Sequence, residues 1–308
     1  MTASRAVGLI GLGTMGGAFA RHLLATDYAV SGYDIDAARR RELKRLGGMP
    51  AASVAVVSRA NPVIITSLPS VQACEAVFFE RGGIAHEAPR RTIVIETSTM
   101  PLELKLALRD ECATRGITVL DCPISGTGAQ AAAKDTSVYA SGDADAVQRC
   151  RGIFAGFARS THYCGEYGNG SKLKFIANLL VTIHNVAAAE AIVLGRKSGL
   201  DARLLYDVIR DGAGTSRMFE VRGAKMIADD YSNASMAVGL YQKDIDIIGG
   251  FGAALHCPTP LFSASTQFYT AALAQGRERD DPAVVCAVLA QMASSPEERN
   301  AKGRARKR

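Results

Sequence analysis

The sequence lacks the paired cysteines and clustered histidines from which metal sites are built. Its seven cysteines stand singly, with no C-x-x-C pair, and its five histidines show no metal-ligand spacing with cysteine or acidic residues. We therefore expect no metal site. An odd and dispersed set of cysteines in 308 residues also favours reduced thiols, as in a cytoplasm, over a disulfide framework.

No segment resembles a targeting signal or a membrane span. The start, Met1–Arg5, lacks the charged and apolar regions of a signal peptide, which again favours a cytoplasmic protein. The most apolar long segment, Leu173–Leu194, contains Lys174, Asn178 and Glu190, which are costly in hydrocarbon. We interpret it as a helix buried inside a protein, and we expect no contact with a membrane.

Excess charge is scarce outside the last residues. The net charge is +6, but five basic residues fall within positions 302–308, which leaves +1 for the rest of the chain. A nearly neutral body does not indicate a nucleic-acid enzyme. We interpret residues 296–308 as a basic, disordered tail, and contact of this tail with phosphate is the alternative.

The sequence does contain the alternation of strands and helices that is typical of an α/β fold. Its 308 residues, 48% apolar and 21% charged, fit two globular domains. Because parallel strands need long crossovers, short β-branched runs between helical stretches predict β-α-β units. Strands are expected at 6–10, 29–33, 63–67, 92–96, 117–121, 137–141 and 161–164, and helices at 14–25, 36–46, 71–79, 101–114 and 144–154. We expect all seven strands in one doubly wound, Rossmann-type sheet.

The pattern changes after Cys164. Residues 165–170 form a turn-rich hinge, and beyond them we find no convincing strand. Ser171 is expected to cap a helix that runs to about Lys197, with Gly199 as its stop. We therefore predict a Rossmann domain at 1–167, an interdomain helix at 168–198 and an all-helical C-terminal domain at 199–295.

The segment after the first strand matches the dinucleotide fingerprint G-x-G-x-x-G. The motif alone is weak evidence in a chain with 30 glycines, because it can match by chance. The predicted strand before it and the predicted helix after it are what favour a dinucleotide site. Gly11 permits the tight turn, Gly13 lets a pyrophosphate approach the backbone, and Gly16 lets helix and strand pack closely. Thr14 and Met15 open the helix, whose N-terminus attracts phosphate. A turn without a ligand is the alternative.

Asp34 ends the second predicted strand, where a dinucleotide ribose would lie. Its carboxylate can accept hydrogen bonds from a ribose diol and would repel a 2′-phosphate, so we expect NAD rather than NADP as the cofactor. The run Arg39–Arg41 contains cations that could reach a phosphate. We interpret these arginines as a solvated helix face.

A Ser-Gly-x-Gly loop follows the fifth predicted strand. Ser125, Gly126, Thr127 and Gly128 lie at the edge where open α/β sheets bind ligands. Successive backbone N–H groups and a hydroxyl in such a loop can hold a carboxylate. A plain turn accounts for the residues equally well.

Lys174 and Asn178 stand four residues apart at the start of the long apolar helix and share a helix face. Burial lowers the pKa of an amine and brings it towards working pH. Such a lysine can take a hydroxyl proton during oxidation and return it during reduction, with Asn178 holding the same hydroxyl. A lysine that only pairs with a carboxylate is the alternative.

Taken in order, these motifs resemble the β-hydroxyacid dehydrogenase family, which includes 3-hydroxyisobutyrate dehydrogenase, tartronate semialdehyde reductase and L-threonate dehydrogenase. The resemblance covers residues from about 7 to 289. The segments that carry it are GLIGLGTMG at 8–16, ETSTMP at 96–101, DCPISG at 121–126, GNGSKLK at 168–174 with Asn178, and Lys243-Asp244.

The resemblance implies a Rossmann domain, a long interdomain helix and an all-helical domain, in a homo-oligomer (dimer or tetramer). It assigns Lys174 as the catalytic lysine with Asn178 as its polar neighbour. By the same matches, Ser125, Gly126 and Thr127 would bind the substrate carboxylate, and Leu68, Pro69, Thr99 and Lys243 would contact the dinucleotide. Two residues depart from the family pattern: Thr127 replaces a glycine, and Ala177 replaces the first of two asparagines.

The expected activity is therefore hydride transfer between NAD and a short hydroxy acid that resembles 3-hydroxyisobutyrate or L-threonate. Residues 214–219 and 187–190 are most similar to the L-threonate dehydrogenase branch. Reduction of a small semialdehyde acid or an imine is one alternative, and a non-catalytic module that binds NAD or a partner is another. The presence of Lys174 with Asn178 argues against the non-catalytic alternative.

Overall fold

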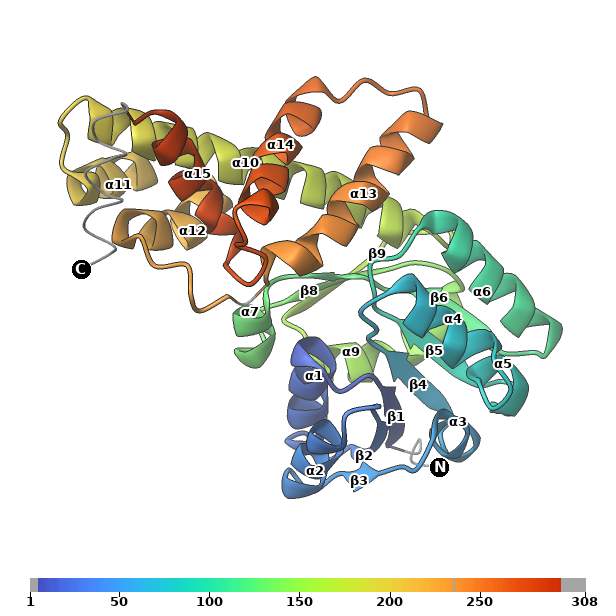
Figure 1. The fold of residues 1–308 in the computed structure, drawn as a ribbon. Helices are drawn as coiled ribbons and strands as arrows, with labels where there is room; N and C mark the ends of the chain where they lie inside the picture. The colour runs from blue at the N-terminus through green and yellow to red at the C-terminus, as the bar shows by residue number, and fades with distance from the viewer. Residues whose placement is uncertain (1–4, 235, 295–308) are drawn as a thin grey trace. The chain divides into compact units, whose positions relative to one another are not determined.

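The chain forms two compact units in the computed structural model, which describes residues 5–234 and 236–294. The first unit ends at Phe175 and the second begins at Ile176, so the division falls inside helix α10 (Asn169–Lys197) (Figure 1). The finer boundaries at 167 and 198 remain predictions. The predicted tail at 296–308 lies outside the described residues.

A six-stranded parallel sheet forms the centre of the first unit, in the order β3-β2-β1-β4-β5-β6. Its strands are β1 (Ala6–Ile10), β2 (Ala29–Tyr33), β3 (Met49–Pro50), β4 (Val63–Thr66), β5 (Ile93–Glu96) and β6 (Thr118–Asp121). The strand order reverses between β1 and β4, and ligands of doubly wound sheets bind at such a switch point. The predicted Rossmann-type sheet is confirmed.

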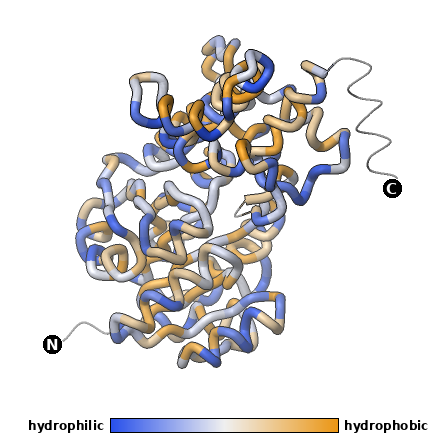
Figure 2. Tube along the Cα trace, turned by 90° about the vertical axis from the view of Figure 1, so that its left-hand side faces the viewer, coloured by the Kyte–Doolittle hydropathy of each residue, from blue (hydrophilic) through white to orange (hydrophobic). Residues whose placement is uncertain are grey.

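Helices cover both faces of this sheet. They are α1 (Thr14–Leu24), α2 (Ala37–Arg45), α3 (Val54–Ala60), α4 (Val71–Phe79), α5 (Ile84–Glu87) and α6 (Leu102–Thr114). Neighbouring strand residues point to opposite faces, so Leu9 belongs to one hydrophobic cluster and Ile10 to the other. Figure 2 shows hydrophobic segments gathered mostly inside the unit. Burial on both faces explains why the strands are continuous apolar runs.

One expectation about this sheet was wrong. The strands predicted near 137–141 and 161–164 do not join it, but form a separate sheet of β7 (Ile124–Ser125), β8 (Ser137–Ala140) and β9 (Ser160–Tyr163). The unpredicted strand β7 pairs antiparallel with β8, and a bridge between Asp121 and Ser141 links the end of β6 to the residue after β8. A two-residue strand is too short for its alternation to appear in the sequence.

The helix expected at 144–154 is two helices, α8 (Ala144–Arg149) and α9 (Arg151–Phe157), which follow α7 (Gly128–Ala132). Helix α10 begins at Asn169, so Ser171 lies inside the helix and does not cap it. Instead, the Ser171 hydroxyl donates to the Asp121 carboxylate. Gly199 follows the helix at φ +84°, as a helix stop requires.

The described residues of the second unit form helices joined by loops and contain no strand, as predicted. After most of α10 it contains α11 (Ala202–Asp211), α12 (Arg217–Ala228), α13 (Val238–Ala254), α14 (Pro260–Ala274), a 3₁₀ turn (Pro282–Val284) and α15 (Val285–Met292).

Helix α10 is, among the described residues, the one helix long and apolar enough to cross a membrane by length and composition alone. Three of its polar side chains, Asn178, Thr182 and Asn185, are nevertheless buried and paired inside the second unit. Asn185 Nδ2 donates to the Tyr269 hydroxyl at 2.9 Å, and the Thr182 and Tyr241 hydroxyls lie 2.8 Å apart. Such buried polar pairs are typical of a helix in a protein core.

Candidate active site

The glycine-rich loop between β1 and α1 has the backbone that the fingerprint predicts. Gly11 has φ +88°, and a Cβ there would lie 2.1 Å from the carbonyl oxygen of Ser67. A Cβ on Gly16 would lie 1.9 Å from the carbonyl oxygen of Gly11. Only glycine fits these two positions, because the first needs a left-handed backbone and the second packs α1 directly against the turn.

Gly13 differs from both, because a Cβ there would meet no atom within 4 Å. The space above it is open, and α1 begins with neither a side-chain cap nor an acidic residue in its first turn. Its first N–H groups and positive dipole end therefore suit an anion. A cavity of about 170 Å³ lies beside the loop, lined by residues that include Gly13, Thr14 and Arg39. This cradle fits a dinucleotide pyrophosphate.

Asp34 follows β2 and is bound to the same loop. Its Oδ2 accepts from the backbone N–H of Leu12 at 2.7 Å, and its Oδ1 accepts from that of Asp36 at 2.8 Å. Each oxygen keeps a lone pair for a further donor, such as a ribose hydroxyl.

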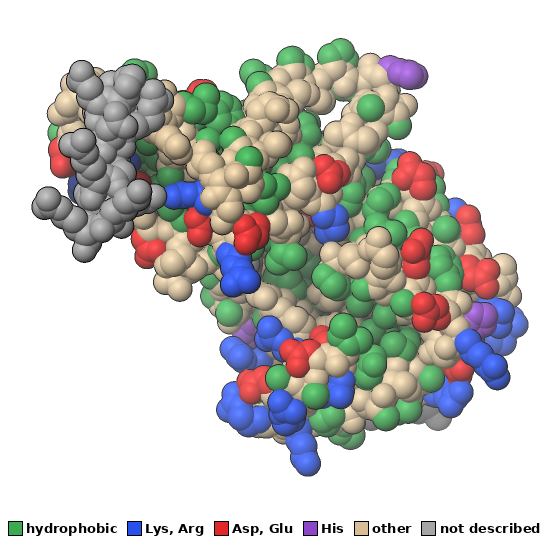
Figure 3. Space-filling view, in the orientation of Figure 1, with side chains coloured by type: hydrophobic (Ala, Val, Ile, Leu, Met, Phe, Trp, Pro, Cys, Tyr) green, Lys and Arg blue, Asp and Glu red, His purple; other side chains and the backbone are tan. Residues whose placement is uncertain are grey.

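The arginines that follow Asp34 belong to α2. Arg40 donates to the carbonyl oxygen of Asp34 and lies over the Tyr33 ring, and Arg39 lies 4.0 Å from the Asp36 carboxylate. Figure 3 shows blue side chains gathered at the lower edge of the first unit, where α2 lies. These contacts agree with the solvated helix face that we expected.

The predicted cofactor contacts after β4 and β5 lie at the same edge of the sheet. The Leu68 backbone N–H donates to Ser98 Oγ at 2.9 Å, and the Ser98 N–H donates to Glu96 Oε1 at 2.9 Å. Pro69 is exposed, and Thr99 is half-buried. The carboxyl ends of adjacent parallel strands bring these loops together.

The predicted carboxylate loop is built partly by strand β7. Ser125 is half-buried, and Gly126 has φ +143°, with a Cβ position only 2.8 Å from Thr136 Cγ2. Thr127, the departure from the family pattern, begins α7 with a capping box: its Oγ1 accepts from the Gln130 N–H, and its own N–H donates to Gln130 Oε1. The Thr127 amide is therefore already engaged, which leaves Ser125 and Gly126 as the more open donors.

The two predicted catalytic residues lie one turn apart on α10. Lys174 is half-buried in the last turn that belongs to the first unit, and Asn178 is buried at the start of the second. Asn178 Nδ2 donates to Asp244 Oδ2 at 3.0 Å, and Lys243 Nζ lies 2.8 Å from Asp244 Oδ1. Asp244 thus joins two predicted site residues, a role that the sequence analysis did not assign to it.

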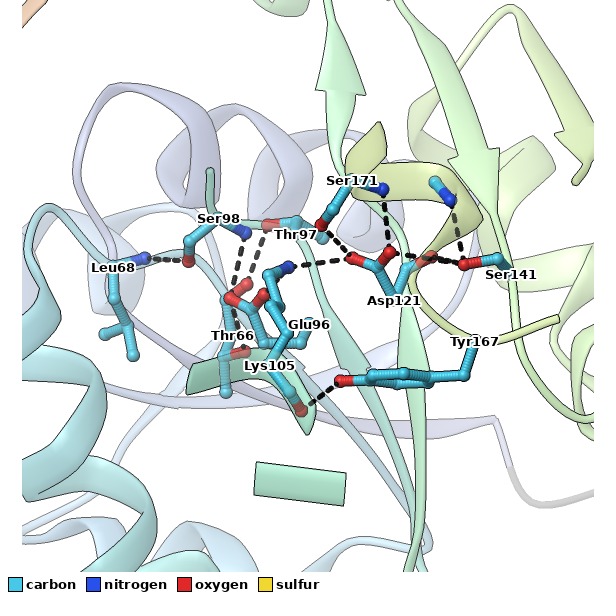
Figure 4. A network of polar contacts seen from close by, with 11 residues as sticks. Thr66, Leu68, Glu96, Thr97, Ser98, Lys105, Asp121, Ser141, Tyr167 and Ser171 are labelled. Carbon is cyan, nitrogen blue, oxygen red and sulfur yellow. Dashed lines mark hydrogen bonds and ion pairs between the residues drawn. The ribbon is translucent and has the colours of Figure 1, made fainter. Parts of the chain in front are cut away.

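A group of charges that the sequence did not lead us to expect is made by Lys105, Glu96 and Asp121, all of which are fully buried (Figure 4). Lys105 Nζ lies 2.9 Å from Asp121 Oδ1 and also pairs with Glu96. Burial alone would lower the pKa of Lys105, but the charges of Asp121 and Glu96 outweigh it and hold the pKa above its usual value. The sequence gives only a weak signal here, an acid at the end of each of two apolar strands.

Among the described residues, no group of three or more His, Cys, Asp or Glu side chains is placed to hold a metal ion. Within the first unit, the polar groups described above lie in the loops at the carboxyl edge of the sheet and at the start of α10.

Known proteins resemble this chain in sequence and fold. Residues 6–165 match the NAD-binding domain of 6-phosphogluconate dehydrogenase, and residues 168–289 match the NAD-binding family of NADP-dependent 3-hydroxyisobutyrate dehydrogenase. The L-threonate dehydrogenase of Cupriavidus necator is 34% identical over 93% of this chain and 96% of its own.

Two further relatives have different names. The NAD-dependent L-serine dehydrogenase of Pseudomonas aeruginosa is 30% identical over 91% of this chain and 96% of its own. The crystal structure of 3-hydroxyisobutyrate dehydrogenase from Salmonella typhimurium superposes with a TM-score of 0.83 at 28% identity, over 92% of this chain and 99% of the other. The chain therefore belongs to the β-hydroxyacid dehydrogenase family and is an NAD(P)-dependent oxidoreductase that acts on hydroxy acids.

Proposed function

We propose that the chain transfers a hydride between a short-chain hydroxy acid and NAD, with Lys174 as the general acid–base. The observation that carries this proposal is the position of Lys174, half-buried in the first turns of α10 within the family's Gly-x-Gly-Ser-Lys-x-Lys segment. Bound NAD would supply the hydride acceptor. Lys174 Nζ would take the hydroxyl proton during oxidation and return it during reduction.

NAD, rather than NADP, is the proposed cofactor because of Asp34. Its carboxylate is held beside the glycine-rich loop by the Leu12 N–H. A ribose diol can donate to this carboxylate, whereas a 2′-phosphate would bring a second negative charge next to it. Leu68, Pro69, Thr99 and Lys243 are proposed as further cofactor contacts.

The substrate carboxylate is proposed to bind at Ser125 and Gly126, with Thr127 beside them. Asn178 would hold the reacting hydroxyl, and its amide is oriented by the bond from Nδ2 to Asp244. This bond leaves Asn178 Oδ1 and its second N–H for the substrate. The arrangement would hold one end of the acid while the carbinol carbon is presented to the cofactor.

An L-threonate-like acid is the first candidate substrate, because the Cupriavidus necator relative bears that name and segments 187–190 and 214–219 are most similar to that branch. A 3-hydroxyisobutyrate-like acid is the second. The reverse reaction on a semialdehyde acid, imine reduction and non-catalytic NAD binding are outcomes that the assay below separates.

We also propose a cytoplasmic homo-oligomer, a dimer or a tetramer, without membrane or nucleic-acid partners. Within the second unit, exposed Leu180, Ala187 and Leu194 recur on α10 at seven-residue intervals. An apolar stripe with this period suits pairing with the same helix of a second copy. Light scattering should give a mass of two or four chains, and a monomer at micromolar concentration would contradict the proposal.

An NAD-linked assay tests the proposed activity. L-threonate and other four-carbon sugar acids, 3-hydroxyisobutyrate, glycerate and 3-hydroxypropionate should be offered with NAD and with NADP, and NADH formation followed by absorbance. We expect turnover of at least one acid, faster with NAD than with NADP. NAD binding without turnover of any acid, semialdehyde or imine would favour the non-catalytic alternative.

A further inference from the structure

Three charged side chains lie fully buried where the strands meet the start of α10 (Figure 4). Glu96 ends β5, Asp121 ends β6, and these two residues are paired in the sheet register. Lys105, in the first turn of α6, reaches between them. Two carboxylates and one ammonium leave an excess of negative charge, which the positive end of the α10 dipole offsets.

Stability alone is a poor reason for such a group. Removing charges from water costs about as much free energy as their attraction returns, and apolar residues of the same volume often stabilise a core better. The group can, however, orient neighbouring parts of the chain, because each carboxylate oxygen holds the hydrogen-bond donor that faces it in one position.

Asp121 orients the first turn of α10. Its Oδ2 accepts from the Ser171 backbone N–H at 2.7 Å, and its Oδ1 accepts from the Ser171 hydroxyl at 2.8 Å. Ser141 Oγ donates to Asp121 and accepts from the Gly170 N–H at 3.0 Å. A carboxylate on strand β6 thus acts as a distant cap for the helix.

The helix start is also held by close packing. A Cβ on Gly170 would lie 2.4 Å from the carbonyl oxygen of Tyr139 and 2.8 Å from that of Asp121. The first turn of α10 therefore rests directly on the backbones of β6 and β8. Close packing and the Asp121 bonds together fix both the height and the rotation of the helix.

Lys174 follows Ser171 by three residues and lies in the same unit. A lysine amine extends roughly 8 Å from the helix axis, so a rotation of about 10° moves it by about 1.4 Å. A misplacement of this size can reduce turnover by about two orders of magnitude.

The same group reaches the cofactor side through Glu96. Its Oε1 accepts from the Ser98 N–H, and Ser98 Oγ accepts from the Leu68 N–H. One continuous set of bonds therefore runs from a predicted cofactor loop, through Lys105, to the helix of the proposed catalytic lysine (Figure 4).

We propose that Asp121, held by Lys105 and Glu96, is a positioning residue that sets the rotation of the first turn of α10 and hence the place of the Lys174 amine. This inference rests on the proposed role of Lys174. It assigns to the buried charges an effect on turnover, with no direct contact to substrate or cofactor.

Three variants test the proposal. Asp121→Asn removes the charge and one acceptor, and Ser171→Ala removes a single hydroxyl. Leu108→Ala is the control, because Leu108 lies fully buried on α6 and belongs to the core cluster, and none of the bonds above involves its side chain. The measurements are kcat, KM, the Kd of NAD and hydrogen exchange of amides 170–174.

We expect Asp121→Asn to lower kcat by about 100-fold and to speed exchange at 170–174 by at least tenfold, with the Kd of NAD within threefold of wild type. Ser171→Ala should lower kcat by about fivefold, which keeps the test decisive should Asp121→Asn not fold. Leu108→Ala should lower Tm and leave kcat within twofold.

Two results would overturn the proposal. One is a folded Asp121→Asn protein with kcat within twofold of wild type, and the other is hydrogen exchange of amides 170–174 in that variant at the wild-type rate. If the wild-type protein oxidises no hydroxy acid, the proposed function fails, and exchange alone then decides whether Asp121 anchors the helix.

Discussion

The carboxylate of Asp34 accepts a hydrogen bond from the backbone N–H of Leu12 at 2.7 Å. Leu12 lies in the glycine-rich loop after β1, and Asp34 follows β2, so this bond fixes the charge of Asp34 beside the cradle above Gly13. One side chain thereby shapes the loop and, in the proposed function, would offer acceptors to the ribose of NAD.

Replacing Asp34 by serine should therefore weaken the binding of NAD and reduce the preference for NAD over NADP. We expect the KM for NAD to rise about tenfold, because charge-assisted bonds to the diol are lost, while the ratio of kcat/KM for NADP over NAD increases. Asp36→Ser is the matched control, since serine can still cap α2 at this exposed position. Steady-state kinetics with both cofactors measure these changes. An unchanged ratio of kcat/KM for NADP over NAD in Asp34→Ser would contradict the role given to this carboxylate.

Two glycine-to-alanine substitutions should separate binding from folding. Gly13→Ala fits without a clash and has φ −64°, so we expect Tm to fall by only a few degrees while the Kd of NAD rises about 10- to 100-fold. Gly16→Ala places a methyl group 1.9 Å from a backbone oxygen and should unfold or aggregate the protein. Calorimetric titration with NAD measures the Kd, and thermal melting measures the Tm. Gly13→Ala with wild-type affinity would exclude a close approach of the pyrophosphate to this loop.

The cysteines should react in three classes, according to whether each is exposed, half-buried or buried. None of the seven forms a disulfide, Cys257 is exposed and Cys164 is half-buried. Burial raises the pKa of Cys112 and Cys150 to about 12 and that of Cys286 to about 11. A raised pKa means that the thiol form persists, so at about pH 8 no more than about one thiol in a thousand is the reactive thiolate.

We therefore expect a thiol reagent to label Cys257 rapidly and Cys164 slowly at this pH, and the buried cysteines only in denaturant. Cys257→Ser should remove the rapid phase and leave the slow one. Rapid labelling of three or more thiols in the folded protein would contradict the packing described here.

Much of the first unit was predictable from the sequence because its strands are short apolar runs between helices. Strands β1 and β2 begin and end at the predicted residues, and their pairing places Asp34 next to the glycine-rich loop. The all-helical second unit was predictable from the absence of strand patterns after Cys164. The local pattern of apolar residues is sufficient to predict an element when the spacing of these residues matches the face that the element buries.

Contacts between distant residues were not predictable in this way. The strand β7 has two residues, so the separate small sheet leaves no periodic signal. Ser171 resembles a helix cap in sequence, yet its hydroxyl donates a hydrogen bond to Asp121, fifty positions earlier in the chain. Lys105 lies in a helix of ordinary composition, and only the tertiary structure shows that it is fully buried between two carboxylates.

The proposed role of Lys174 is tested most directly by a comparison of two lysines on α10. Lys174→Met should lower kcat by about 10³-fold or more with the Kd of NAD within threefold, because the proton-transferring amine is lost and the cofactor site is intact. Lys172→Met is the matched control, since Lys172 is exposed and bonds only its neighbour Asn169 among the described residues; it should retain kcat within twofold. A Lys174→Met protein that turns over near the wild-type rate would contradict the proposed mechanism.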